Sequence, residues 1–285
     1  MRAHPICERR QTRDYGWRPV CLLALIPEIN SSLLISFSSV QLRPMVRRMG
    51  EALEYDISLL ERLYTKSENQ DIIKTMLDVQ YRSPERLNTF PSQEFYEGKL
   101  RSSTTDVQLL HPLTRSTFPW PNENGLIPSV FVQCSAEEDM GRMSKSNTVQ
   151  VDLVDHIISR LNSNRPNEVE PDESERPLSL TVLTPYARQV QHLRQRLHSS
   201  VTVSTVDSFQ GRESDIVIFS TVRSNAEGDI GFLSDRRRLN VMWTRARLAL
   251  IIVGDRRTLT TDHLWDRALR ACAQVDVGFI PPATE

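Results

Sequence analysis

The stretch from residue 201 to 255 restricts the fold of this chain more than any other. Two apolar runs rich in β-branched residues, at 216–222 and 248–253, lie on either side of an arginine-dense segment at 236–247. Runs of this kind are typical of strands buried on both faces of a parallel sheet. Asp235 stands just before the arginine-dense segment and suits a helix N-cap. The stretch therefore predicts strand, helix and strand of an α/β domain.

The same alternation continues through most of the chain. Further strands are expected at 75–82, 130–134, 178–183 and 201–206, and further helices at 50–64, 85–96, 148–161, 185–197 and 261–273. This order predicts a mostly parallel sheet with helices on both faces, and loops that follow the strands along one edge. The connection at 99–127 is expected to be loop-rich, with Phe118 and Trp120 against the domain surface, and the acidic stretch 163–177 to be a solvated loop.

Composition narrows the classes of protein that fit. The chain has 285 residues, 39% of them hydrophobic, which is enough for one large domain or two small ones. A net charge of −1 excludes a globally basic surface, so nucleic-acid binding would depend on local clusters. Acidic residues gather at 168–175, which predicts locally unbalanced arginines at 236–247. Four scattered cysteines without C-x-x-C spacing argue against a zinc site or a disulfide framework, and for a reducing compartment.

Several linked motifs resemble one known family. TVDSFQGRE, STVRSN, IGFLSD and RRLNVMWTRAR occur in that order and precede a strand that ends at Gly254 and Asp255. They resemble motifs V and VI of superfamily 1 helicases, and most closely the Upf-like group that acts on RNA and DNA. The resemblance covers about residues 41–272. It implies a RecA-like (P-loop NTPase-type) fold, Mg²⁺ and ATP as cofactors, single-stranded RNA or DNA as substrate, and protein partners of RNA decay or surveillance.

The resemblance also assigns a nucleotide site. Arg245 occupies the position of the arginine finger, and Arg82 that of a second phosphate-contacting arginine. Further nucleotide contacts fall on Tyr81 for the adenine, Glu213 for a ribose hydroxyl, Gln41 for the γ-phosphate, and Gly211. The residues alone leave other uses open: a surface arginine that meets a carboxylate, a core tyrosine, and a glutamate in a plain surface ion pair.

A second group of residues is implied to contact the nucleic acid. It comprises Thr184, Pro185, Tyr186, Thr205, Ser208 and Arg223. Small hydroxyl groups at strand ends can hold phosphates without reading bases. The alternative is that these hydroxyls cap the next element of the chain.

The sequence also departs from the family pattern. No G-x-x-x-x-G-K-S/T phosphate loop occurs in the chain, nor a strand ending in the Asp-Glu pair that would hold Mg²⁺. At motif III, Phe37, Ser38 and Ser39 replace the expected Gly-Asp-His-like turn. In the arginine-dense helix, Trp243 stands where a small or aliphatic residue is usual, and if buried it is expected to cost roughly 1–3 kcal/mol through overpacking.

We therefore expect four segments. Residues 1–40 are interpreted as a divergent or mis-spliced leader, 41–70 as a remnant of a first RecA-like domain with a linker helix, 71–275 as the second RecA-like domain, and 276–285 as a tail. The expected function is that of the C-terminal motor domain of a helicase, inactive alone. The alternative is a non-catalytic helicase-like protein that binds nucleic acid or protein. No clean address signal occurs, and an intracellular place, cytoplasmic or nuclear, is expected.

Overall fold

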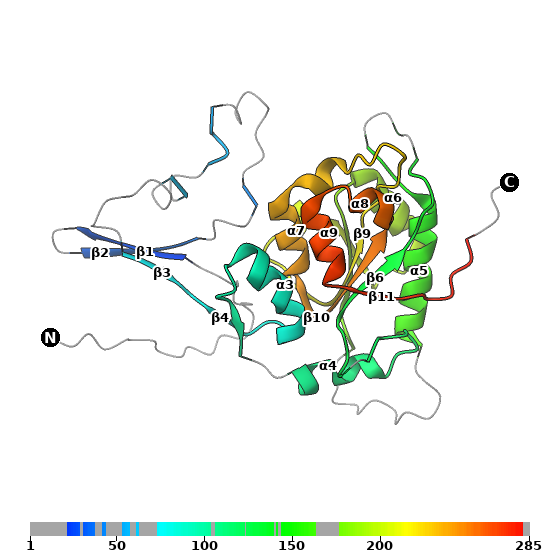
Figure 1. Cartoon of the computed structure of the whole chain (residues 1–285), viewed down its shortest axis with the longest axis horizontal. Helices are drawn as coiled ribbons and strands as arrows, with labels where there is room; N and C mark the ends of the chain where they lie inside the picture. Colours follow the sequence, from blue (N-terminus) through cyan, green and yellow to red (C-terminus); the bar gives the residue numbers. More distant parts are fainter. Residues whose placement is uncertain are drawn as a thin grey trace.

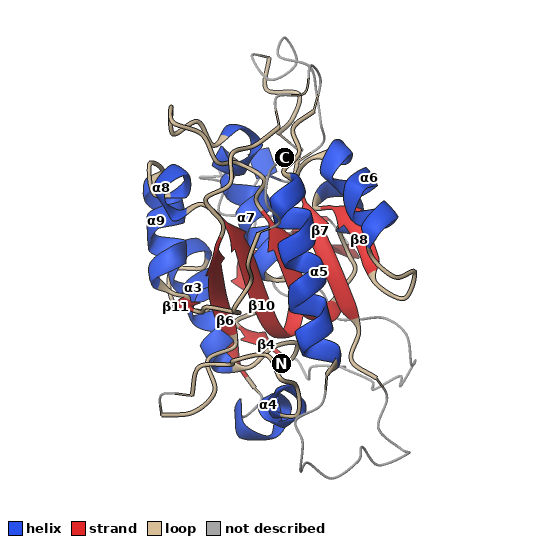
Figure 2. Cartoon of the chain, turned by 90° about the vertical axis from the view of Figure 1, so that its right-hand side faces the viewer, coloured by secondary structure: helices blue, strands red, loops and turns tan. Residues whose placement is uncertain are grey.

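A six-stranded parallel sheet organises the molecule. The computed structural model describes residues 22–28, 31–37, 42–43, 53–57, 61–62, 73–103, 106–122, 124–139, 141, 144–163 and 177–281. The strand order is β11 (Ala273–Gln274), β6 (Ser129–Gln133), β10 (Ala246–Gly254), β9 (Ser214–Ser220), β7 (Leu180–Thr184) and β8 (Thr202–Thr205). Every neighbouring pair is parallel, which confirms the predicted α/β class and the RecA-like sheet (Figure 2).

Helices cover both faces of this sheet. One face packs against α4 (Asp106–Thr114), α5 (Thr148–Asn162) and α6 (Ala187–Arg196). The other packs against α3 (Glu85–Phe95), α7 (Arg236–Trp243) and α9 (His263–Arg270), with α8 (Arg256–Leu259) beside α9 (Figure 1). Strand β9 is buried along its whole length, because its alternate side chains enter two different cores. An unbroken apolar run is what such a central strand needs.

Helices α5 and α7 begin where the sequence predicts, and the predicted cap at Asp235 is confirmed. The Asn147 side chain accepts a hydrogen bond of 3.0 Å from the backbone N–H of Gln150 at the start of α5. The carboxylate of Asp235 accepts from the backbone N–H groups of Arg237 and Arg238 at the start of α7. Each cap satisfies donors that the first turn of a helix leaves without partners.

Several expected elements differ from the structure. Helix α7 ends at Trp243, because the chain must turn onto the sheet before β10 begins at Ala246. Within the helix expected at 50–64, residues 53–57 form a turn, with φ of 57° at Glu54, and residues 61–62 are helical. Helices α4 and α8, and edge strand β11, were not expected from sequence.

Two smaller sheets lie outside the main one. The expected strand at 75–82 is split into β3 (Ile73–Met76) and β4 (Val79–Gln80). Strand β3 joins an antiparallel sheet with β1 (Leu22–Glu28) and β2 (Ser31–Phe37), drawn apart from the parallel sheet in Figure 1. Strand β4 pairs in parallel with β5 (Arg101–Ser102). The local sequence at 22–37 shows no clear period, so this hairpin was not anticipated.

The arginines at 236–247 are not unbalanced, and that prediction was wrong. Carboxylates from distant parts of the chain lie beside them: Glu94 at 3.8 Å from Arg236, Glu61 at 2.7 Å from Arg237, Asp207 at 3.1 Å from Arg238, and Glu213 at 3.6 Å from Arg247. The acidic residues that compensate the helix are therefore brought to it by the fold.

Candidate nucleotide and nucleic-acid sites

The candidate residues lie at two opposite edges of the parallel sheet. Glu213 immediately precedes β9, and Arg245 immediately precedes β10, so both stand at the amino-terminal edge. Tyr186 follows β7 and Arg223 follows β9, so both stand at the carboxyl edge. Only Tyr186 and Arg223 lie on the loops that follow strands, along one edge as expected; Glu213 and Arg245 lie at the other edge, because in a parallel sheet the loops before and after a strand are a strand length apart.

At the amino-terminal edge, the chain brings Arg82 onto Glu213, which lies 131 positions away. Arg82 Nε lies 2.7 Å from Glu213 Oε2, and Arg82 Nη1 donates to the Thr244 carbonyl at 2.9 Å. Arg247 adds a second cation at 3.6 Å from Glu213 Oε1. Arg82 and Glu213, which the sequence could assign only separately, therefore form one cluster with Arg247. In this amino-edge cluster the guanidinium of Arg82 is held at a fixed place.

Arg245 packs inward beside this cluster. Its residue is 2% exposed; Nε donates to the Val241 carbonyl at 3.0 Å and Nη1 to the Arg212 carbonyl at 3.4 Å. Through these bonds Arg245 joins the last turn of α7 to the loop that carries Glu213. In this conformation its guanidinium stabilises the contact between α7 and this loop.

Tyr81 is largely exposed to solvent beside this cluster. It is 70% exposed, which excludes the alternative of a core tyrosine. The buried side chain of Gln80 fixes the backbone on which it stands, since its Oε1 accepts from the N–H groups of Arg82 at 2.8 Å and Ser83 at 3.0 Å. Sequence reasoning missed Gln80, although it directly precedes two assigned residues. Gly211 adopts a φ of 84°, as the turn before Glu213 requires, and Gln41 lies outside the described residues.

Trp243 is accommodated by α3. The indole is buried, its Nε1 donates to the Leu87 carbonyl at 2.9 Å, and its ring centroid lies 4.4 Å from that of Phe90. The polar atom of the large side chain therefore has a partner, and the ring faces another aromatic ring.

At the carboxyl edge, the assigned hydroxyls mostly serve the chain itself. Thr205 Oγ1 donates to Ser208 Oγ at 2.9 Å and accepts from the Ser208 N–H at 3.3 Å, which is the capping use left open above. Thr184 is fully buried, and Pro185 is half-buried. The Tyr186 ring is buried too, and its hydroxyl accepts from Arg223 Nη1 at 3.5 Å. Burial raises the pKa of the Tyr186 hydroxyl.

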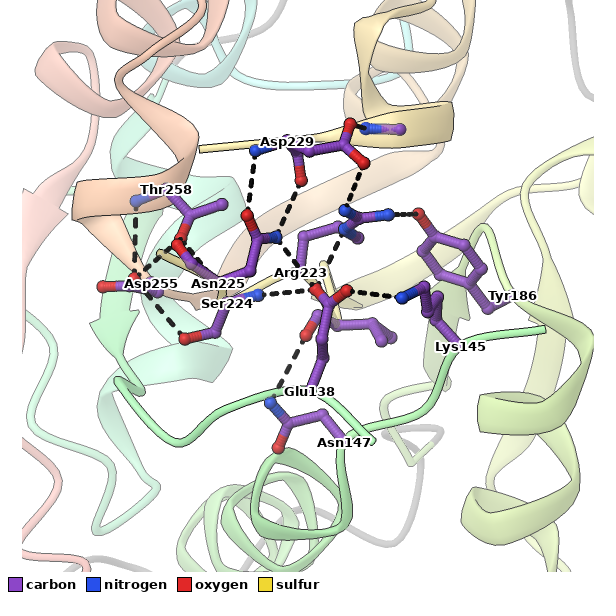
Figure 3. Close-up of polar contacts among 12 residues, drawn as sticks. Glu138, Lys145, Asn147, Tyr186, Arg223, Ser224, Asn225, Asp229, Asp255 and Thr258 are labelled. Carbon is purple, nitrogen blue, oxygen red and sulfur yellow. Dashed lines mark hydrogen bonds and ion pairs between the residues drawn. The ribbon is translucent and has the colours of Figure 1, made fainter. Parts of the chain in front are cut away.

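A buried carboxylate that sequence reasoning did not identify holds this edge together. Glu138 is 3% exposed in its side chain and lies 2.9 Å from Arg223 Nε and 3.0 Å from Lys145 Nζ (Figure 3). It also accepts from the Ser224 N–H at 3.0 Å. Glu138 sits in a short acidic run after β6, and nothing in its local pattern distinguishes it from a surface carboxylate.

The backbone at Arg223 is strained. The preceding residue, Val222, has a φ of 68°, a region that a β-branched side chain rarely adopts and that costs on the order of 1–3 kcal/mol. Arg223 Nη2 lies 2.7 Å from Asp229 Oδ2. A backbone hydrogen bond from Gly231 and this arginine hold the pKa of Asp229 below its usual range. The ion pairs of Arg223 thus fix a loop conformation that the local chain disfavours.

No group of three or more His, Cys, Asp or Glu side chains suited to a metal ion occurs in the part of the chain that the structure describes. No helix within those residues is both long and apolar enough to cross a bilayer.

Comparison with known proteins agrees with this architecture. The profile of the family AAA_12, described as an AAA domain, matches residues 55–257. The chain is 34% identical to the Regulator of nonsense transcripts 1 homolog of Arabidopsis thaliana, over 88% of this chain and 20% of that protein. It is 33% identical to the ATP-dependent helicase NAM7 of Saccharomyces cerevisiae (88% and 25%), and 32% identical to the DNA polymerase alpha-associated DNA helicase A of that yeast (83% and 36%).

The chain spans between 20% and 36% of the length of these three curated relatives. The matched region includes α3, the whole amino-edge cluster and the Glu138 network, and it ends just after β10. The chain therefore belongs to the AAA_12 family, the C-terminal RecA-like part of Upf-like superfamily 1 helicases.

Proposed function

We propose that this chain supplies the arginine-bearing wall of an ATP cleft in an ATP-dependent helicase that acts on single-stranded RNA or DNA. The observation that carries the proposal is the amino-edge cluster, where Arg82 meets Glu213 beside the exposed ring of Tyr81. These are an aromatic face, a carboxylate and a guanidinium, which suit the base, the ribose and the phosphates of a nucleotide.

Each of the three side chains has a definite task in this proposal. The ring of Tyr81 stacks on the adenine, and Glu213 accepts a ribose hydroxyl. Arg82 exchanges its ion pair with Glu213 for a phosphate oxygen, and its bond to the Thr244 carbonyl keeps it aimed during the exchange. A planar guanidinium suits this exchange because it can hold a phosphate through two parallel hydrogen bonds.

Arg245 can act as the finger only after it leaves its present partners. The carbonyls of Val241 and Arg212 are neutral acceptors, and a phosphate that approaches from a second domain would be a stronger, charged one. The burial of Arg245 is also the specific observation that favours the second candidate, a non-catalytic domain that retains the fold to bind nucleic acid or protein.

We infer that the chain does not turn over ATP alone. Its 285 residues contain no phosphate loop, so a guanidinium from this wall has no bound triphosphate to stabilise. The described residues offer no group of metal ligands, and we assign none for Mg²⁺. ATP hydrolysis would then require a phosphate-binding domain on the other side of the cleft.

The carboxyl edge is the proposed contact for the single strand. Thr205 and Ser208 stand at the end of β8, and Tyr186 and Arg223 follow the next two strands of the sheet. The names of the relatives point both to transcripts and to DNA, so either strand type is a candidate, and partners from RNA surveillance are part of the proposal.

The nucleotide wall is tested with two matched tyrosine variants. Tyr81→Ala removes a ring that is 70% exposed, and Tyr55→Ala removes one that is 68% exposed in the turn at 53–57. Binding of a fluorescent ATP analogue to the full chain is measured by anisotropy. We expect Tyr81→Ala to weaken binding about 2- to 10-fold, since stacking contributes about 0.5–1.5 kcal/mol, and Tyr55→Ala to leave it unchanged.

A steady-state phosphate-release assay with and without single strands accompanies this measurement. No turnover is expected from the chain alone. Nucleic-acid-stimulated turnover by the pure protein would refute the proposal that the chain needs a second domain. Equal analogue affinity in the two tyrosine variants would remove the assignment of Tyr81.

A further inference from the structure

We propose that Phe232 is a stacking platform for a base of the single strand at the carboxyl edge. The inference rests on the proposed nucleic-acid function of that edge and adds to it a residue that contacts bases rather than phosphates. It is carried by the exposure of Phe232, by the groups around its ring, and by the rigid support beneath it.

The side chain of Phe232 is exposed to solvent. It belongs to the short 3-10 helix η2 (Gly231–Ser234), where it is 58% exposed while the adjacent Leu233 is buried. The other exposed large apolar side chains among the described residues are Leu53, Tyr55, Leu77, Val79, Tyr81 and Ile280, all on other segments. A single displayed ring suits one base better than a protein partner, which favours a contiguous apolar patch.

The ring is flanked by a cation and a second aromatic ring. Arg238 Cζ lies 5.5 Å from its centroid, and the ring of Tyr186 lies 5.7 Å away at an interplanar angle of 57°. Arg238 is held there by Asp207, with Nε 3.1 Å from Oδ1. Aromatic faces beside guanidinium groups are how proteins bind single strands without sequence preference.

The hydroxyls proposed to meet phosphates stand next to this group. Asp207, which holds Arg238, lies between Thr205 and Ser208 in the sequence; Thr205 is the last residue of β8, and Ser208 lies in the 3-10 turn (Asp207–Phe209) that follows. A strand that contacts these hydroxyls through its backbone would therefore have a base within reach of the ring of Phe232.

The backbone that carries Phe232 is fixed by contacts of the adjacent Gly231 with Asp229, Arg223 and Tyr186. Gly231 has a φ of 52°, and its N–H donates to Asp229 Oδ1 at 2.9 Å. A Cβ on Gly231 would lie 2.8 Å from Arg223 Nη1 and 3.0 Å from the Tyr186 hydroxyl, so a larger residue, already disfavoured by the positive φ, would have to displace these side chains. The ring is therefore presented on a pre-organised backbone, which lowers the entropic cost of stacking.

The test compares Phe232→Ala with Phe232→Tyr in the full chain, and Ile280→Ala serves as a control for the loss of an exposed apolar side chain. The probes are fluorescein-labelled oligothymidylate and oligouridylate of about 15 nucleotides, and an abasic strand of equal length, with affinity measured by anisotropy across a salt series. We expect Phe232→Ala to weaken binding of both base-bearing strands about 5- to 150-fold, the equivalent of about 1–3 kcal/mol of stacking.

The dependence of affinity on salt should keep the same slope in Phe232→Ala, because stacking releases no counterions. Phe232→Tyr and Ile280→Ala should bind as the wild type does, and the abasic strand should bind wild type and Phe232→Ala equally. Wild-type affinity in Phe232→Ala, or an equal loss on the abasic strand, would overturn the inference and leave the proposed function intact. If the wild type binds none of the strands, the proposed nucleic-acid function fails and the inference fails with it.

Discussion

Loss of the Glu138 carboxylate should destabilise the domain more than any surface change. In Glu138→Ala, Arg223 remains 6% exposed in its side chain and loses the partner at 2.9 Å, and the N–H of Ser224 loses its acceptor. Removing one partner of a buried ion pair costs up to about 3–5 kcal/mol, because the remaining charge stays buried without that partner. Arg223 keeps Asp229 at 2.7 Å, but this carboxylate is 67% exposed and therefore compensates the buried charge less than Glu138 does.

The reverse change should cost less. In Arg223→Ala, Glu138 keeps Lys145 at 3.0 Å and the N–H of Ser224, so its charge stays compensated. The double variant removes both charges at once, and its loss of stability should be smaller than the sum of the single losses. The difference is a coupling energy, expected at about 0.5–3 kcal/mol.

Urea unfolding followed by circular dichroism measures all four proteins. Differences in unfolding free energy are calculated from the urea midpoints with one common slope of free energy against urea concentration. A variant with a different slope would have changed the surface area exposed on unfolding rather than the stability alone. Glu138→Ala with a loss below about 1 kcal/mol, or strictly additive single and double variants, would refute the view that this pair holds the strained loop.

Three further outcomes follow from individual side chains. Trp243→Ala should lose about 3–5 kcal/mol in urea unfolding, because it empties a buried aromatic position. Burial raises the pKa of Cys272 to about 12, so at pH 8 this thiol should resist iodoacetamide in the native protein and react in urea, as read by mass spectrometry. Gly231 and Arg223 lower the pKa of Asp229 in the folded protein. The ionised carboxylate therefore stabilises the fold above its unfolded pKa of about 3.9, and this stabilisation is lost as pH falls through the lower folded pKa. Asp229→Asn should reduce the dependence of unfolding free energy on pH in that range, as measured by acid unfolding.

The sequence by itself determined the central strands, the starts of α5 and α7, and the family. The apolar runs at β9 and β10, and the cap Asp235, are readable because the residues that decide them are neighbours in the chain. The linked motifs identified the family for the same reason, since each motif is a short continuous stretch. Assignments of single residues within those motifs remained expectations.

Only the tertiary structure decided which of these residues meet. It separated the candidates onto two edges, joined Arg82 to Glu213 across 131 positions, and turned Arg245 inward. It also brought Glu138 to Arg223 and left the ring of Phe232 in solvent. The hydrophobic periodicity of a segment indicates whether it is helix or strand. The partner and the burial of a polar side chain instead depend on elements far away in the chain, and no local pattern contains that information.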